Sequence, residues 1–162
     1  MIKKTYFAFV FLLIACSNPQ NNEVKLQSRI DSLEKKLENT YSPGLGEFMN
    51  GIQAHHAKLW YAGKNQNWKL ANFEVEEIIE LIEDIQKYKA DRKESKLVNM
   101  VIPSLEEVTK AIEKKDPVMF KNSYSQLTNT CNSCHVATEF EFNVVKVPTT
   151  ESFSNQEFKL TK

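Results

Sequence analysis

The chain has 162 residues, a hydrophobic fraction of 41% and equal numbers of basic and acidic side chains, 21 of each. This length holds one domain of ordinary size together with an export signal. The basic residues form no block and are not interleaved with aromatic residues, which argues against nucleic-acid binding.

The first fifteen residues have the organisation of an export signal. Lys3 and Lys4 form a basic start, and an apolar run of ten residues follows from Tyr6 to Ala15. A membrane-spanning helix needs roughly 20 apolar residues, so this run is too short to remain as an anchor. The sequence therefore predicts a signal peptide over residues 1–15.

The apolar run ends in Leu13-Ile14-Ala15-Cys16, which resembles the lipobox of bacterial lipoproteins. The resemblance implies that the Cys16 thiol is lipidated and that the mature chain begins there. The protein is then expected in the bacterial cell envelope, attached to the lipid bilayer and facing the periplasm. Ser17, in place of aspartate, favours the outer membrane, but the inner membrane stays open. An ordinary secretory signal with a chance cysteine is the alternative.

Residues 16–22 are polar and without periodicity, which predicts a short tether. Residues 23–41 are predicted to form an amphipathic helix. Its apolar seam has spacings of four, three and four: Leu26, Ile30, Leu33 and Leu37. This seam is shorter than three heptads, so two alternatives stay open. The helix forms a coiled-coil stalk and joins a homodimer, or it lies against the main domain.

The rest of the chain predicts an all-α fold, an antiparallel four-helix bundle over residues 45–137. The first helix is expected at about 45–62, ending at Gly63. The second is expected at about 67–89, with its glutamates mostly on a solvated face.

The third and fourth helices have clearer boundary signals. The third is expected within residues 95–115, interrupted by Pro103 and restarted by Ser104 and Glu107, which have the spacing of a capping box. The fourth is expected to begin with Asp116 as N-cap, followed by proline at the first helical position.

Residues 138–162 form a C-terminal tail that differs in character from the helices. Phe140, Phe142 and Val144 alternate with Glu141 and Asn143, which predicts one short strand in an otherwise irregular segment.

The pattern Cys131-Asn132-Ser133-Cys134-His135 has the spacing of c-type haem attachment. Two thiols separated by two residues on a helical turn can reach the two vinyl groups of one porphyrin. The histidine that follows can then direct a ring nitrogen at the iron as proximal ligand. The sequence therefore predicts one covalent haem c on Cys131 and Cys134, with His135 on the iron.

Other uses of the cysteine pair stay as alternatives. A zinc site would need four ligands, and the motif supplies three. A thioredoxin-like pair should open a helix, whereas this pair closes one. A structural disulfide is the third alternative. The odd number of cysteines is explained if Cys16 is lipidated and both motif cysteines form thioethers.

A helical bundle with the haem motif on its last helix resembles the class II, cytochrome c′-like group of c-type cytochromes, over about residues 45–137. The resemblance implies that a residue of the first helix faces the distal side of the haem. That residue is apolar in five-coordinate members and methionine in low-spin ones. This chain departs from the group because 27 residues follow His135. The tail is therefore expected to cover one edge of the haem.

One face of the first predicted helix combines apolar bulk with Met, Gln and His side chains. Met49 is the predicted sixth iron ligand, with His56 or an open distal site as alternatives. Four residues of this face are expected to line the haem pocket: Ile52, Gln53, His56 and Trp60. Gly51 and Gly63 would let the porphyrin or a neighbouring helix approach closely.

These features predict a membrane-anchored monohaem cytochrome that carries single electrons to a redox partner protein that the sequence does not identify. No catalytic constellation accompanies the motif, so enzymatic activity is not expected. Two alternatives belong to other classes: a five-coordinate haem protein that binds or senses NO or CO, and a structural lipoprotein without haem.

Overall fold

The computed structural model describes residues 19–40 and 43–160. The predicted signal peptide, the lipidation site Cys16 and the neighbouring Ser17 lie outside the described residues. The chain divides into two compact units, residues 1–42 and 43–162.

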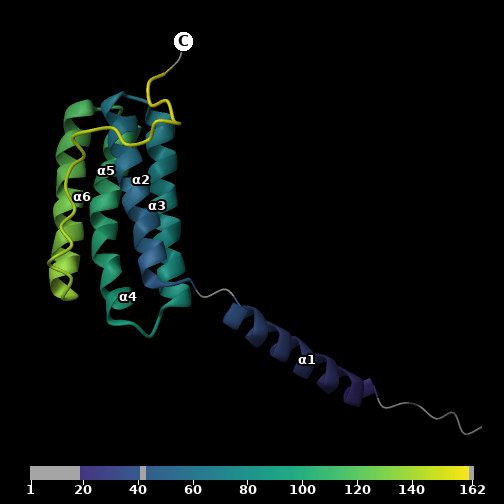
Figure 1. The fold of residues 1–162 in the computed structure, drawn as a ribbon. Helices are drawn as coiled ribbons and strands as arrows, with labels where there is room; N and C mark the ends of the chain where they lie inside the picture. The colour runs from purple at the N-terminus through teal and green to yellow at the C-terminus, as the bar shows by residue number, and fades with distance from the viewer. Residues whose placement is uncertain (1–18, 41–42, 161–162) are drawn as a thin grey trace, which may run out of the picture. The chain divides into compact units, whose positions relative to one another are not determined.

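The fold is all-α, as predicted, and the described residues contain no strand (Figure 1). None of the helices in this part of the chain is long and apolar enough to cross a membrane. The elements in chain order are α1 (Pro19–Thr40), α2 (Leu45–Lys64), α3 (Trp68–Tyr88), α4 (Lys93–Leu97), the 3₁₀ helix η1 (Val98–Val101), α5 (Ile102–Glu113) and α6 (Pro117–Ala137).

Helix α1 forms the described part of the first unit. It begins at Pro19, inside the segment predicted as a tether, and ends at Thr40. The side chains of its apolar seam are between 46% and 70% exposed: Leu26, Ile30, Leu33 and Leu37. The helix is therefore amphipathic, and the side chains of its apolar face are exposed.

In the second unit α2, α3, α5 and α6 lie side by side, and the closest packing joins α2 to α3 and α5 to α6 (Figure 1). The apolar residues recur at helical spacing, so each helix has one face to bury. In α3 the buried apolar positions are spaced by four, three, four and three residues: Ala71, Val75, Ile78, Ile82 and Ile85. The arrangement is consistent with a helical bundle.

One glutamate of α3 departs from the predicted solvated face. Glu74 is fully buried, and its Oε2 lies 2.7 Å from Nδ1 of His55 on α2. Glu76 and Glu80 are exposed, as expected. The prediction is wrong for Glu74 because helical periodicity places a residue on a face but does not show which neighbouring side chains meet it.

The start of α6 is confirmed in detail. The Asp116 carboxylate accepts hydrogen bonds from the backbone N–H groups of Val118 and Met119, both at 2.9 Å. These bonds satisfy donors that have no partner inside the helix. Pro117 occupies the first helical turn, where a missing N–H costs nothing.

The predicted capping box in the third helical segment is wrong. The interruption of the helical segment occurs before Pro103, at the 3₁₀ helix η1. Pro103 itself lies inside the first turn of α5. Ser104 does not cap the helix, because its hydroxyl bonds to the Thr130 hydroxyl of α6 at 2.8 Å. A proline is tolerated in a first turn, so α5 needs no restart after it.

The tail from residue 138 onward turns back at the end of α6. Glu139 has a left-handed φ of 69°, and the Phe140 N–H bonds to the His135 carbonyl at 2.8 Å. This is a Schellman-type helix end. The tail then runs back along α6 and crosses toward α2 (Figure 1). Buried Phe158, whose ring centre lies 5.5 Å from that of Tyr61, fixes its far end.

The short strand predicted within the tail does not form. Residues 140–144 are all exposed, and the Asn143 N–H bonds to the Phe140 carbonyl at 2.9 Å, which makes residues 140–143 a turn. An extended segment needs a neighbouring strand to satisfy its backbone groups as a ladder, and the described residues supply none. The tail is therefore irregular. The prediction of an irregular segment is confirmed, and the prediction of a strand within it is wrong.

Candidate functional site

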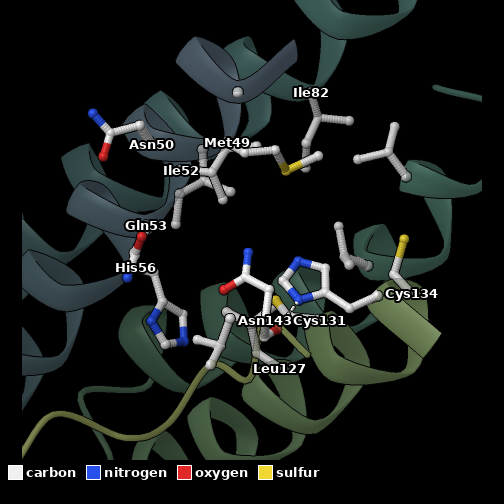
Figure 2. Close-up of a pocket in the computed structure, with 16 residues that line it drawn as sticks. Met49, Asn50, Ile52, Gln53, His56, Ile82, Leu127, Cys131, Cys134 and Asn143 are labelled. Atoms are coloured by element: carbon white, nitrogen blue, oxygen red, sulfur yellow. Dashed lines mark hydrogen bonds between the residues drawn. The ribbon is translucent and has the colours of Figure 1, made fainter. Parts of the chain in front are cut away.

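A cavity of about 330 Å³ lies between α2, α3, η1 and α6 and is bordered by the tail (Figure 2). This volume is within the usual range for small-molecule and cofactor sites. The residues that line it are Gly46, Met49, Asn50, Ile52, Gln53, His56, Ile78, Ile82, Val98, Val101, Leu127, Cys131, Cys134, His135, Asn143 and Val145. The fold thus brings all three chemically distinctive residues of the cysteine motif to one hollow.

A second cavity of about 330 Å³ adjoins the first. The two share five lining residues: Gly46, Met49, Cys134, His135 and Asn143. The two hollows therefore meet at Met49 and His135, and the space around the motif is wider than either hollow alone.

Cys131 and Cys134 lie in the last turns of α6, and their thiols are free. Burial raises the pKa of the Cys131 thiol to about 11 and also raises the pKa of Cys134. Reactive redox cysteines show the opposite shift, which a helix N-terminus or a nearby positive charge produces. Here the negative end of the α6 dipole is close. This environment does not suit a thioredoxin-like dithiol.

His135 follows Cys134 near the end of α6 and borders both cavities. Its Nδ1 lies 2.5 Å from the backbone carbonyl oxygen of Asn143. A carbonyl can only accept, so Nδ1 carries the proton and the lone pair of Nε2 is left for a ligand. Metal-binding histidines usually make such a bond through the nitrogen that does not bind the metal.

Met49 of α2 borders both cavities and is partly buried against the core. In Figure 2 it lies across the cavity from Cys131, and its side chain extends into the open space. The predicted sixth ligand is therefore positioned on the wall opposite the cysteine motif.

His56 lines the cavity, but both of its ring nitrogens already have partners on α6. Nε2 lies 3.0 Å from the Thr128 hydroxyl, and Nδ1 lies 2.9 Å from the Tyr124 hydroxyl. Burial lowers the pKa of His56 to about 4, so the ring is neutral at physiological pH. These contacts suit a hydrogen-bonded core histidine and weigh against His56 as an iron ligand.

Three of the four predicted lining residues border the cavity: Ile52, Gln53 and His56. Trp60 does not. Its ring centre lies 4.9 Å from that of Tyr124 and 6.3 Å from that of Phe120, within an aromatic cluster of the core. Trp60 lies one turn further along α2 than His56. There the aromatic side chains of α6 pack against it, so it does not face the cavity.

Gly51 and Gly63 allow close approach of neighbouring side chains and not of a cofactor. A Cβ atom at Gly63 would lie 2.1 Å from the Phe120 ring of α6, and one at Gly51 would lie 2.9 Å from Leu81 of α3. Neither glycine lines the cavity.

The sequence predicted that the tail would cover one edge of the site but not which of its residues do so, and it did not predict the contributions of α3 and η1. Asn143 and Val145 come from the tail, and the length of chain after His135 was the only signal for them. The apolar residues from α3 and η1 carry no signal that separates them from ordinary core: Ile78, Ile82, Val98 and Val101.

Comparison of the chain with protein-family models, with curated proteins and with solved structures finds no match. Within the described ranges 19–40 and 43–160, no group of three or more His, Cys, Asp or Glu side chains is arranged to hold a metal ion directly.

Proposed function

We propose that this protein is a monohaem c-type cytochrome that carries single electrons. In this proposal Cys131 and Cys134 hold one haem c covalently, and His135 is the proximal iron ligand. One observation carries the proposal. The three motif residues border a single cavity, and the Nδ1 bond to the Asn143 carbonyl leaves Nε2 of His135 available to iron.

The residues of the cavity fit this group. The free thiols are separated by two residues on one helix, where they can form two thioethers to one macrocycle. Apolar side chains from α2, α3 and η1 supply walls that exclude water: Ile52, Ile78, Ile82, Val98 and Val101. The bound iron would supply a one-electron couple. The protein would orient the haem and lower the dielectric constant around it.

Met49 is the proposed sixth ligand, which makes the site suited to electron transfer. His/Met ligation favours a higher reduction potential than a bis-histidine site. The hydrogen bonds of His56 support Met49 as the ligand. Among the described residues that line the cavity opposite the cysteine motif, His56 and Met49 are of the usual haem-ligating types, and Met49 has the free donor atom.

The proposed architecture is an antiparallel four-helix bundle of the class II, cytochrome c′-like type, formed by α2, α3, α5 and α6. Their side-by-side packing, with the haem motif on the last helix, supports it (Figure 1). Helix α1 would be an additional element that precedes the bundle.

We also propose that the protein is held in the bacterial cell envelope through lipidated Cys16, facing the periplasm, where it meets a redox partner protein. The lipobox-like sequence before Cys16 supports this placement. Electron-transfer encounters bury little surface, so a small exposed edge of the site is enough for them.

Haem attachment is tested on protein produced in a host with c-type haem maturation machinery. We expect haem to stay with the protein during acid-acetone extraction and the intact mass to include one haem. Replacing both thiols, Cys131→Ala with Cys134→Ala, should abolish attachment. Ser133→Ala is the matched control, because Ser133 lies inside the motif and should keep the haem. Haem that extracts freely from wild-type protein would contradict covalent attachment, and wild-type protein without haem would favour a structural lipoprotein.

The same material tests the sixth ligand. Wild-type protein should show the sulfur-to-iron charge-transfer band when oxidised and should not bind CO when reduced. Met49→Ala should remove the band and open the iron to CO. If wild-type protein binds CO readily and lacks the band, the distal site is open and the gas-binding function takes its place.

A further inference from the structure

The side chain of Asn132, between the two cysteines, is bonded through both of its amide atoms to one residue of the tail. Its Nδ2 donates to the Val145 carbonyl at 2.9 Å, and its Oδ1 accepts from the Val145 N–H at 2.8 Å. A primary amide paired with both backbone groups of one residue holds that residue in position and in orientation. The tail is therefore attached to α6 at Val145.

The attached segment also supplies the partner of His135. The Asn143 carbonyl, two residues before Val145, accepts the Nδ1 hydrogen bond. Asn132 and His135 are three residues apart on α6, so they share one face of the helix, and the tail runs along this face. The Schellman-type turn at Glu139 closes the loop from His135 to Asn143.

Before Asn143, the tail is held by a backbone turn, in which the Asn143 N–H bonds to the Phe140 carbonyl at 2.9 Å. The adjacent Phe142 and Val144 are 78% and 71% exposed, so they bury little apolar surface. The segment has no neighbouring strand among the described residues. Val145 is partly buried at the cavity, and its bonds to Asn132 are the hydrogen bonds that hold the segment after Asn143 against α6.

We propose that Asn132 is a positioning residue for the proximal ligand. By holding Val145 it keeps the Asn143 carbonyl against Nδ1 of His135 and thereby sets how strongly Nε2 donates to iron. This inference rests on the proposed role of His135. A hydrogen bond from the distant ring nitrogen makes the ligating nitrogen more basic, which favours the more positive, oxidised iron. The pair Asn132–Val145 thus lowers the reduction potential.

The test removes the pairing from either side. Asn132→Ala deletes the amide, and Val145→Pro deletes the tail N–H while leaving Asn132 intact. Ser133→Ala is the matched control, because the Ser133 hydroxyl bonds only within α6, to the Asn129 carbonyl at 3.0 Å. We expect both test variants to have a higher midpoint potential than wild type in a spectroelectrochemical titration, and Ser133→Ala to match wild type.

Amide hydrogen exchange provides a readout that does not depend on the iron. The Val145 amide should be protected in wild-type protein and should exchange roughly fivefold faster in Asn132→Ala, the factor that a hydrogen bond of about 1 kcal/mol represents. Protection should be unchanged in Ser133→Ala.

Each outcome bears on the inference. An unprotected Val145 amide in wild-type protein would show that the pairing does not exist and would overturn it. Faster exchange with an unchanged potential would also overturn it, because the pairing would then hold the tail without acting on His135. If wild-type protein carries no covalent haem, the proposed function fails and this inference fails with it. Failure of the inference alone leaves the haem in place.

Discussion

The imidazole of His56 joins α2 to α6 through two hydroxyl groups, those of Tyr124 and Thr128. The Tyr124 hydroxyl also donates to the His56 backbone carbonyl at 2.8 Å. Only 3% of His56 is exposed, so water cannot replace these partners. The residue thus combines two roles: it forms part of the cavity wall, and it connects the helix that carries Met49 to the helix that carries the cysteine motif.

His56 gives the stability a dependence on pH. Burial lowers its pKa from 6.5 to about 4, so between these values the unfolded chain binds a proton that the folded chain does not. Stability is therefore highest above pH 6.5 and falls as the pH falls toward 4. The loss is about 3 kcal/mol over this range, since one pKa unit is worth about 1.4 kcal/mol. Urea denaturation at a series of pH values measures it.

His56→Gln is the control for this pH dependence. It removes this titrating group, and the remaining slope then comes from the other titratable groups of the chain. We expect the wild-type curve to be steeper than the variant curve between pH 6.5 and pH 4. Parallel curves would show that His56 takes up its proton in the folded state as readily as in the unfolded state.

At the scale of elements, α2 and α3 are joined by a buried polar pair. His55 Nδ1 lies 2.7 Å from Oε2 of Glu74, whose side chain is 1% exposed. The ring of His55 also has its Nε2 3.8 Å from Glu77. The other carboxylate oxygen of Glu74 has no hydrogen-bond partner in the structure. The pair lies apart from the residues that line the cavity, so its effect on stability can be measured without altering the site.

Removing one member of this pair should cost much more than removing both. His55→Leu leaves the Glu74 carboxylate buried without its partner, and we expect the free energy of unfolding to fall by about 3 kcal/mol. The double variant with Glu74→Leu should recover most of this loss, because no buried polar group is then left without its partner. Chemical denaturation of the single and double variants measures both values.

The exposed pair of Lys110 with Glu107 on α5 is the matched control. Its atoms are also 2.7 Å apart, but the side chains are 53% and 52% exposed. Lys110→Ala should change stability by no more than about 0.5 kcal/mol. A His55→Leu variant as stable as this control would show that Glu74 is satisfied without His55.

For the whole molecule, the described structure consists of α1 and a separate helical unit that contains the cavity. The proposed membrane attachment lies before α1, at Cys16. Helix α1 has 22 residues, which at about 1.5 Å per residue makes it about 33 Å long. Along the chain, this helix lies between the proposed lipid anchor and the unit that contains the cavity. A coiled-coil stalk formed by α1 stays a prediction.

Cys16→Ala should abolish stable membrane attachment. The apolar run before it is too short to span a bilayer, so attachment depends on the acyl chains, of which two or more are needed for stable binding. We expect the variant in the soluble fraction or as an unprocessed precursor when cells are fractionated. Cys131→Ala is the control, since it disturbs the haem motif and should still fractionate with membranes. Wild-type behaviour of Cys16→Ala would contradict the lipoprotein prediction.

Features that depend on neighbours in the sequence were predictable. Helical periodicity predicted the all-α fold and the positions of α2, α3 and α6 to within a few residues. Asp116 was predictable as an N-cap because its carboxylate satisfies N–H groups two and three residues later. The cysteine motif was recognisable because two thiols and an imidazole within five residues can serve one macrocycle whatever surrounds them.

Features that depend on distant segments were decided only by the tertiary structure. Periodicity put Glu74 and Trp60 on helix faces, but the packing of α2 against α3 and α6 paired one with His55 and placed the other in the aromatic core. No local pattern showed that Asn132 bonds to Val145, or that Asn143 reaches His135. These contacts exist because the chain reverses at Glu139, and which backbone carbonyl then meets the imidazole depends on the path of the tail across α6.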